Sequence, residues 1–194
     1  QAAEPTTARA MLGSLTTRSE SGSTTYERSA FRHWVDADRD GCDTREEVLI
    51  AESRVAVATE AGCRVLTGRW VSWYDGATWT NPADVHIDHV VALKEAWESG
   101  ARSWTSTRRQ AFANDLGHGW VLEAVTDNVN ASKSDHDPAQ WLPPRSSVHC
   151  RYAQRWVAVK YRWRLSVDTA ERARLAALLS GTCGDKTQTI QRAP

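Results

Sequence analysis

DHVV at residues 88–91 and NASKSD at residues 130–135 are the two stretches that decide the fold. The residues before Asp88 predict a strand that ends near it, and residues 121–125 predict a second short strand. Asp127 follows directly as a candidate helix cap, so Asn130 is expected on a helix. The local order is therefore strand, long connection, strand, helix.

Three side chains in these stretches suit one metal-dependent hydrolytic site. Asp88 and Asn130 offer the hard oxygen ligands that a divalent cation prefers, and His89 is a suitable base near neutral pH. Phosphodiester hydrolysis needs an activated water, a charge sink for the leaving 3′ oxygen and an anchor for the phosphates. Lys133, one turn beyond Asn130, is a candidate phosphate contact.

Strand geometry leaves an alternative interpretation open. Adjacent residues of a regular strand point to opposite faces, so Asp88 and His89 share a site only where the strand bends or ends. His86 lies on the same face as Asp88 and is a rival for either role. In the alternative, Asp88 binds a backbone amide, His89 is a half-buried structural histidine, and Asn130 only starts a helix.

The length of 194 residues suits one domain, which we expect to be α+β and mostly helical, with a small antiparallel sheet. An N-terminal helix and linker are expected over 1–25, the main domain over 26–185 with its core at 84–137, and a flexible tail over 186–194. Residues 63–80 predict a small meander of strands. Residues 148–165 predict a strong helix with Tyr152, Trp156, Val159 and Trp163 on one stripe.

The four cysteines are Cys42, Cys63, Cys150 and Cys183. Their even number without CxxC spacing favours two disulfides over a zinc site. Cys42–Cys63 and Cys150–Cys183 are the favoured pairs, because each closes a loop inside one half of the chain. Disulfides imply an oxidising compartment, so a mature secreted protein is expected. No apolar run approaches the ~20 residues of a membrane helix.

Residues 36–47 (DADRDGCDTREE) match the template of a calcium-binding loop. The oxygen ligands in this template would come from Asp36, Asp38, Asp40, Thr44 and Glu47. The template predicts a structural calcium ion or another divalent ion. The alternative is an acidic, solvated turn that caps the helix expected over 45–54 and is held by a disulfide.

Charge is balanced overall but not along the chain, because residues 138–167 contain basic residues and no acidic one. Arg151 and Arg155 lie beside the aromatic stripe of the helix expected over 148–165. This pattern predicts a helix that contacts phosphates without reading sequence. The alternative is a solvated basic face on a helix that buries its tryptophans.

The two opening stretches resemble the HNH endonucleases, also called ββα-metal or His-Me finger nucleases. The fuller pattern over roughly residues 30–165, which includes IDHVVAL, FAND and WLPP, is similar to secreted actinomycete-type members of that group. The resemblance implies a ββα-metal core in which Asp88 and Asn130 bind Mg²⁺, or alternatively Mn²⁺, and His89 is the base.

One position departs from that pattern. The middle asparagine of the HNH nucleases, which helps to orient the base, would fall near Trp120 or Val121, and neither is Asn or His. A backbone carbonyl could take over this role. The side chains that are candidates for it, or for an extra metal ligand, are His86, Asn114, His118 and His136.

The sequence therefore predicts a secreted, monomeric, metal-dependent endonuclease. Its substrate would be DNA, with RNA as a second option, cut with little sequence preference to give 5′-phosphate ends. Two other classes stay open. One is a calcium-binding extracellular interaction module, and the other is a nucleic-acid-binding protein with a degenerate nuclease site.

Overall fold

The strand pair predicted around Asp88 is present in the computed structural model, which describes residues 3–194. β6 (Val85–His89) and β7 (Leu122–Thr126) are antiparallel, with His89 opposite Leu122 and Asp88 opposite Glu123. α5 (Asp127–Lys133) starts directly after β7 and contacts both strands. The predicted order of strand, connection, strand and helix is therefore observed.

The other strands form separate antiparallel pairs. β2 (Ala58–Thr59) pairs with β3 (Val65–Thr67), and β4 (Trp70–Val71) pairs with β5 (Thr78–Trp79). The meander predicted over 63–80 contributes to both pairs. β4 also contacts β7, so these hairpins pack beside the central strand pair.

The two ends of the chain are joined by a strand pair of their own. β1 (Glu4–Thr7) is antiparallel to β8 (Thr187–Ile190), and Ile190 and Ala193 are buried. The segment 186–194, expected as a flexible tail, thus contains an ordered strand. The reason is that its few apolar side chains enter the common core, a contact between distant segments that no local pattern shows.

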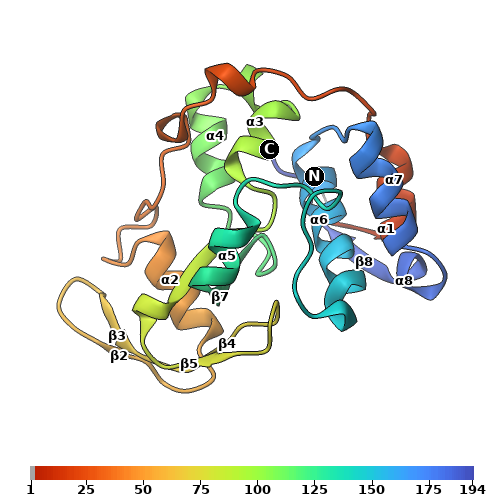
Figure 1. Ribbon diagram of the computed structural model, residues 1–194. Coiled ribbons are helices and arrows are strands. Elements are labelled where there is room, and N and C mark those ends of the chain that lie inside the picture. Colours follow the sequence, from red (N-terminus) through yellow and green to blue (C-terminus); the bar gives the residue numbers. More distant parts are fainter. Residues whose placement is uncertain (1–2) are drawn as a thin grey trace.

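Helices provide most of the regular structure. They are α1 (Ala8–Ser14), α2 (Thr44–Glu52), α3 (Leu93–Glu98), α4 (Ser106–Ala113), α5, α6 (His149–Trp163), α7 (Thr169–Leu178) and α8 (Thr182–Asp185). In Figure 1, α1, α6, α7 and α8 gather on one side and α2 with β2–β5 on the other, while α5 and β7 lie between them.

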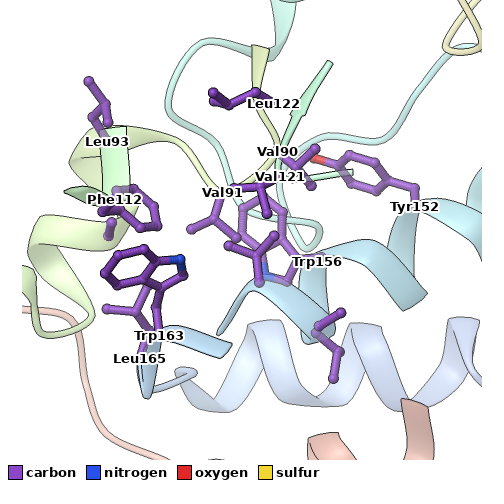
Figure 2. Close-up of a cluster of buried hydrophobic side chains, with 14 of the residues drawn as sticks. Val90, Val91, Leu93, Phe112, Val121, Leu122, Tyr152, Trp156, Trp163 and Leu165 are labelled. Carbon is purple, nitrogen blue, oxygen red and sulfur yellow. The ribbon is translucent and has the colours of Figure 1, made fainter. Parts of the chain in front are cut away.

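α6 runs through the hydrophobic core. The predicted stripe of Tyr152, Trp156, Val159 and Trp163 is buried, because helical spacing places these side chains on one face. Figure 2 shows Trp156 and Trp163 beside Val91 and Phe112, which come from the β6 end and from α4. The core therefore joins the helical side of the molecule to the strand that carries Asp88 and His89.

A buried ion-pair network reinforces this junction. The Lys160 ammonium on α6 lies 2.5 Å from a Glu95 carboxylate oxygen on α3 and 2.7 Å from one of Glu171 on α7, and it donates to the Ser166 carbonyl at 2.8 Å. All three charged side chains are buried. Such a set is stable only because each charge has a partner, so it fixes three helices together.

The two disulfides join the predicted pairs. Cys42 is bonded to Cys63 and Cys150 to Cys183, with Cα–Cα distances of 5.0 and 5.9 Å. The first ties the loop before α2 to the segment before β3, and the second ties α6 to α8. Each disulfide therefore closes one loop covalently, one in each half of a single α+β domain.

Within residues 3–194, no helix is both long and apolar enough to cross a membrane.

Candidate active site

Asp88 is a buried carboxylate held by two side chains. Only 4% of the residue is exposed. The Lys133 ammonium donates to Oδ1 at 2.6 Å and to Oδ2 at 2.8 Å, and the Tyr74 hydroxyl donates to Oδ2 at 2.6 Å. Lys133 also donates to the backbone carbonyl of His89 at 2.8 Å. The end of α5 is thus fixed to the tip of β6 through one ammonium group.

Burial and charge act against each other in this cluster. Lys133 is fully buried. Its burial lowers its pKa, while the Asp88 carboxylate opposes that shift. Burial, followed by the charge of Asp88, raises the pKa of Tyr74 well above its ordinary range. Tyr74 therefore remains a neutral donor. The sequence predicted that Lys133 contacts a phosphate. Its side chain has no solvent exposure and donates to Asp88 instead.

His89 occupies a different environment from Asp88. It is 6% exposed, and its ring lies parallel to Trp34 with centroids 5.2 Å apart and edge-on to His33 at 5.8 Å. Its Nε2 lies 2.9 Å from the carbonyl oxygen of Ala113, the last residue of α4. A carbonyl can only accept, so Nε2 carries the proton and Nδ1 keeps a free lone pair.

The surroundings of His89 keep its imidazole neutral. Burial lowers its pKa to about 3, although the bond to Ala113 opposes that shift. The Ala113 carbonyl also fixes the ring orientation, as a hydrogen-bonding partner does for a catalytic histidine. The sequence left the group that orients this ring open between a backbone carbonyl and the side chains of His86, Asn114, His118 and His136, and in the structure a backbone carbonyl binds the ring. His89 is therefore a neutral imidazole with a fixed orientation, and its role as base stays a prediction.

Asp88 and His89 contact different neighbours, as expected of adjacent strand residues. Asp88 faces Tyr74 and α5, whereas His89 faces Trp34 and the end of α4. They meet at the end of β6, where Lys133 binds both the Asp88 carboxylate and the His89 carbonyl. The structure therefore brings Asp88, His89 and Lys133 together at the strand tip.

Asn130 and His86 line one cavity next to this tip. The cavity has a volume of about 430 Å³ and is also lined by Arg28, Lys94 and Asp135. Asn130 is half-buried and His86 is exposed. In the described part of the chain, neither side chain has a hydrogen-bond partner. Both are therefore free to bind a ligand that enters the cavity.

The remaining acceptor positions suit a divalent cation. A carboxylate accepts about four hydrogen bonds, and the three contacts from Lys133 and Tyr74 leave Oδ1 of Asp88 one further position. The side-chain oxygen of Asn130 is a hard ligand, and the His86 ring offers a nitrogen. Asp88 does not line the cavity of Asn130 and His86, so a cation shared by these three residues stays a prediction.

Asn114 has a structural position. Its Oδ1 accepts from the Val35 amide at 3.0 Å and the Thr44 hydroxyl at 2.9 Å, and its Nδ2 donates to the carbonyls of Arg32 and Gln110 at 2.8 Å each. These bonds fix the segment 32–35 against α4. Asn114 thus contributes indirectly, because that segment carries the rings packed on His89.

The other two candidate histidines lie elsewhere. His118 stacks on Trp120 and accepts from the Gln191 amide through Nε2 at 3.2 Å. His136 is exposed and lines a cavity of about 610 Å³ with Glu20, Glu95 and Glu98. Neither shares a contact with His89 in residues 3–194.

Arg151 and Arg155 project from α6 toward Trp73. Their guanidinium carbons lie 4.5 and 4.8 Å from the Trp73 ring centroid. Arg155 also forms an ion pair with Glu123, the residue opposite Asp88, whereas Arg151 is exposed. Arg151 therefore has the exposure that contact with a phosphate requires.

The acidic loop gathers its carboxylates at the surface. Carboxylate oxygens of Asp36, Asp38 and Asp40 lie within 4.8 Å of one another, and all three residues are exposed. Burial, followed by the charges of these aspartates, raises the pKa of Glu47. Thr44 is buried, and its hydroxyl oxygen lies 2.9 Å from both the Val35 carbonyl oxygen and Asn114 Oδ1, so this hydroxyl is engaged inside the protein. Calcium binding here stays a prediction.

Four neighbours of the site were not singled out as site residues from the sequence: Arg28, His33, Trp34 and Tyr74. They lie far from Asp88 along the chain, and spacing carries no signal for such contacts. Trp34 stands just before the acidic loop, and Tyr74 lies within the predicted meander. The contacts of Trp34 and Tyr74 with the site were therefore not foreseen, because the sequence assigned their segments to a loop and to a strand meander.

Comparison with known proteins places the chain in a family. No solved structure matches it. A protein of Arthroderma benhamiae (strain ATCC MYA-4681 / CBS 112371), described as an uncharacterized secreted protein, is 45% identical over 177 residues, which cover 91% of this chain and 85% of that protein. Residues 43–178, from α2 through α7, match the family described as GmrSD restriction endonucleases, C-terminal domain. The chain belongs to the GmrSD restriction endonuclease C-terminal domain family.

Proposed function

We propose that this protein is a metal-dependent endonuclease of the HNH type, which hydrolyses phosphodiester bonds of DNA, and in second place RNA, with little sequence preference. The observation that carries the proposal is the placement of His89. Its Nε2 is bound by the Ala113 carbonyl at 2.9 Å, its ring is clamped by Trp34, and its Nδ1 is free to accept a proton. Membership of a restriction endonuclease family supports the same chemistry.

In this mechanism His89 Nδ1 removes a proton from a water that attacks phosphorus in line with the leaving 3′ oxygen. The products then carry 5′-phosphate ends. The Ala113 carbonyl positions the ring and stabilises the imidazolium that forms. Trp34 limits ring rotation, so the base is held ready before substrate binds.

Asp88 and Asn130 would hold the divalent cation, with His86 as a further ligand. Mg²⁺ is the expected ion and Mn²⁺ the alternative, because the set is rich in oxygen. When bound, such an ion supplies a charge sink for the leaving oxygen. Lys133 neutralises Asp88 from the protein interior, so the carboxylate keeps its position with or without the ion.

We also propose that the protein acts outside the cell, as a monomer. The relative from Arthroderma benhamiae is described as secreted. The two disulfides suit an oxidising compartment. Low sequence preference follows from a site in which phosphate contacts carry most of the binding.

A second candidate function is a calcium-binding extracellular interaction module, which the convergence of Asp36, Asp38 and Asp40 favours. A nucleic-acid-binding protein with an inactive site is a third. It is the least favoured, because the Ala113 carbonyl already orients His89 without the missing asparagine.

One experiment separates these functions. Purified protein is incubated with plasmid DNA and with RNA in Mg²⁺, Mn²⁺, Ca²⁺ or chelator, and strand breaks and end groups are measured. The proposal predicts nicking in Mg²⁺ or Mn²⁺, 5′-phosphate ends and no nicking in chelator. Binding of nucleic acid without nicks in every condition would support the inactive-site alternative. If the protein neither binds nor nicks nucleic acid, the calcium-binding interaction module would be the supported function.

A further inference from the structure

Two cavities adjoin on the α6 side of β7. The larger, of about 890 Å³, is lined by Trp120, Arg151, Arg155 and Lys186, among others. The smaller, of about 430 Å³, is lined by Arg54, Arg145, Trp73 and again Arg151 and Arg155. Both cavities are lined by the two α6 arginines, so they lie side by side. We call the two cavities together the basic groove and define it by Arg54, Arg145, Arg151, Arg155 and Lys186.

The basic groove carries positive charge that the protein does not neutralise. Among residues 3–194, four of its five cations make no ion pair, and only Arg155 has an acidic partner, Glu123. Glu52 is the other carboxylate of the groove, and it accepts from the Ala124 amide at 3.0 Å. The cations therefore outnumber the acids, and a groove of unpaired cations is complementary to a polyanion.

An aromatic side chain borders the same groove. Trp120 is half-buried and stacks on His118, with centroids 4.6 Å apart and an interplanar angle of 20°. It also lines the larger cavity. Bases of a single strand stack on such rings, and every base has a face that can do so. The faces of stacked bases in a duplex are covered by their neighbours.

The groove begins at the end of the strand pair that carries the candidate active site. Trp120 stands two residues before Leu122, which is paired with His89. Glu123, in the wall of the smaller cavity, is opposite Asp88. The groove shares no lining residue with the cavity of Asn130 and His86, so its position beside the tip of β6 rests on the pairing of β7 with β6.

We infer that the basic groove binds a single nucleic-acid strand, with phosphates on its unpaired cations and one base stacked on Trp120. This inference rests on the proposed function and deepens it, because it names single-stranded nucleic acid as the form that the protein binds best. The disulfide Cys150–Cys183 fixes one wall, since Thr182, Cys183 and Lys186 line the cavity beside it.

The test measures binding without cleavage. Wild-type protein in chelator, and separately the His89→Ala variant, are titrated against a fluorescent oligothymidine and against a hairpin duplex of equal phosphate number. The inference predicts tighter binding of the single strand. Trp120→Ala should weaken that binding roughly tenfold, whereas Trp120→Phe, which keeps a stacking ring, should change it about threefold or less.

Charge is tested with a matched pair of arginine variants. Arg151→Ala should reduce the slope of log affinity against log salt by about 0.7, the value for one phosphate contact to a single strand. Arg174→Ala, on the exposed face of α7 and outside both cavities, should leave the slope unchanged. Circular dichroism checks the fold of each variant, and Trp120→Leu replaces Trp120→Ala if the latter unfolds.

Failure of the groove and failure of the nuclease proposal give different results. Equal binding by wild type, the Trp120 variants and Arg151→Ala would overturn the groove even if the protein cleaves DNA. Stronger binding of the duplex than of the single strand would overturn the single-strand assignment. If the protein never cleaves but the groove variants lose binding, the single-strand binding site would be supported and the nuclease proposal would be wrong.

Discussion

Two regions of this molecule hold carboxylates that are candidate cation ligands, and they do so in opposite ways. Asp88 is buried, accepts three contacts from Lys133 and Tyr74, and belongs to the regular core. Asp36, Asp38 and Asp40 are exposed. They accept hydrogen bonds from amides of their own loop; the Arg39 amide, for example, donates to Asp36 at 2.8 Å. The sequence predicted a cation at both.

The difference teaches what each region can do without a metal. The core holds its own cation in Lys133, so Asp88 is already neutralised and placed before any ion binds. No ion pair joins the loop aspartates to a cation among the described residues, and the mutual repulsion of these carboxylates is relieved by loop amides, by solvent or by a bound ion. An ion at β6 would therefore serve chemistry, while an ion at the loop would serve stability.

The largest effect expected from this comparison is the loss of Lys133. Lys133→Met leaves the Asp88 charge buried without a cation, which should lower the free energy of unfolding by about 3–5 kcal/mol. Urea denaturation followed by tryptophan fluorescence measures it. The matched surface change, Asp38→Asn, should cost under about 0.5 kcal/mol in chelator.

The double variant Asp88→Leu/Lys133→Met sharpens that prediction. Removing both charges should restore part of the stability lost in Lys133→Met, because no unpaired charge remains. A Lys133→Met variant as stable as wild type would contradict the account of a buried ion pair.

A smaller effect is expected from calcium at the surface loop. If residues 36–47 bind the ion only in the folded state, saturating calcium at about 100 times the dissociation constant adds roughly 2.7 kcal/mol to stability. Thermal melting with calcium or chelator measures the shift. Asp38→Asn and Asp40→Asn should reduce it, while Asp84→Asn, an acid outside the loop, should not. If the melting temperature of the wild type is the same with calcium and with chelator, the loop does not bind calcium and its carboxylates are only solvated.

The smallest effect concerns Glu52, a carboxylate between the two extremes. It is partly buried with one backbone donor, and burial raises its pKa from 4.5 to about 7. The folded protein keeps this proton up to about pH 7, whereas the unfolded chain releases it near pH 4.5. Its contribution to stability is therefore complete below pH 4.5 and is lost as pH rises through 7.

Glu52→Gln keeps an acceptor for the Ala124 amide and removes the titration. The difference in unfolding free energy between wild type and this variant should change by about 2 kcal/mol between pH 4.5 and 8, less than the roughly 3.4 kcal/mol of a fully buried group because Glu52 is partly exposed. Denaturation series at several pH values measure it. Parallel curves for the two proteins would show that the carboxyl titrates normally.

Much of the fold could be predicted because its signals are local. The strand pair, the helix that carries Asn130, the aromatic stripe of α6 and both disulfide pairs follow from periodicity, capping and spacing. The β1–β8 pair could not be predicted, because it joins the two ends of the chain. α2 starts at Thr44, one residue before the helix expected over 45–54, because Asp43 caps it by accepting from the Glu46 amide.

The candidate site was predictable only along the chain. DHVV and NASKSD identified Asp88, His89 and Asn130, and the structure brings the ends of these stretches together through Lys133. The partner of the His89 ring could be named only as an unspecified backbone carbonyl among other options, because the Ala113 carbonyl has no side-chain identity to recognise. The clamp by Trp34 and the bond from Tyr74 depend equally on tertiary packing.

The most direct measurement compares cleavage of a labelled DNA strand by wild type, His89→Ala and Arg174→Ala in Mg²⁺. The last variant removes an exposed side chain of α7 that lines neither the cavity of Asn130 nor the basic groove. Loss of the base should slow cleavage by about 10²- to 10⁴-fold in His89→Ala, while Arg174→Ala stays within a few-fold of wild type. A folded His89→Ala protein that cuts DNA at the wild-type rate would contradict the account.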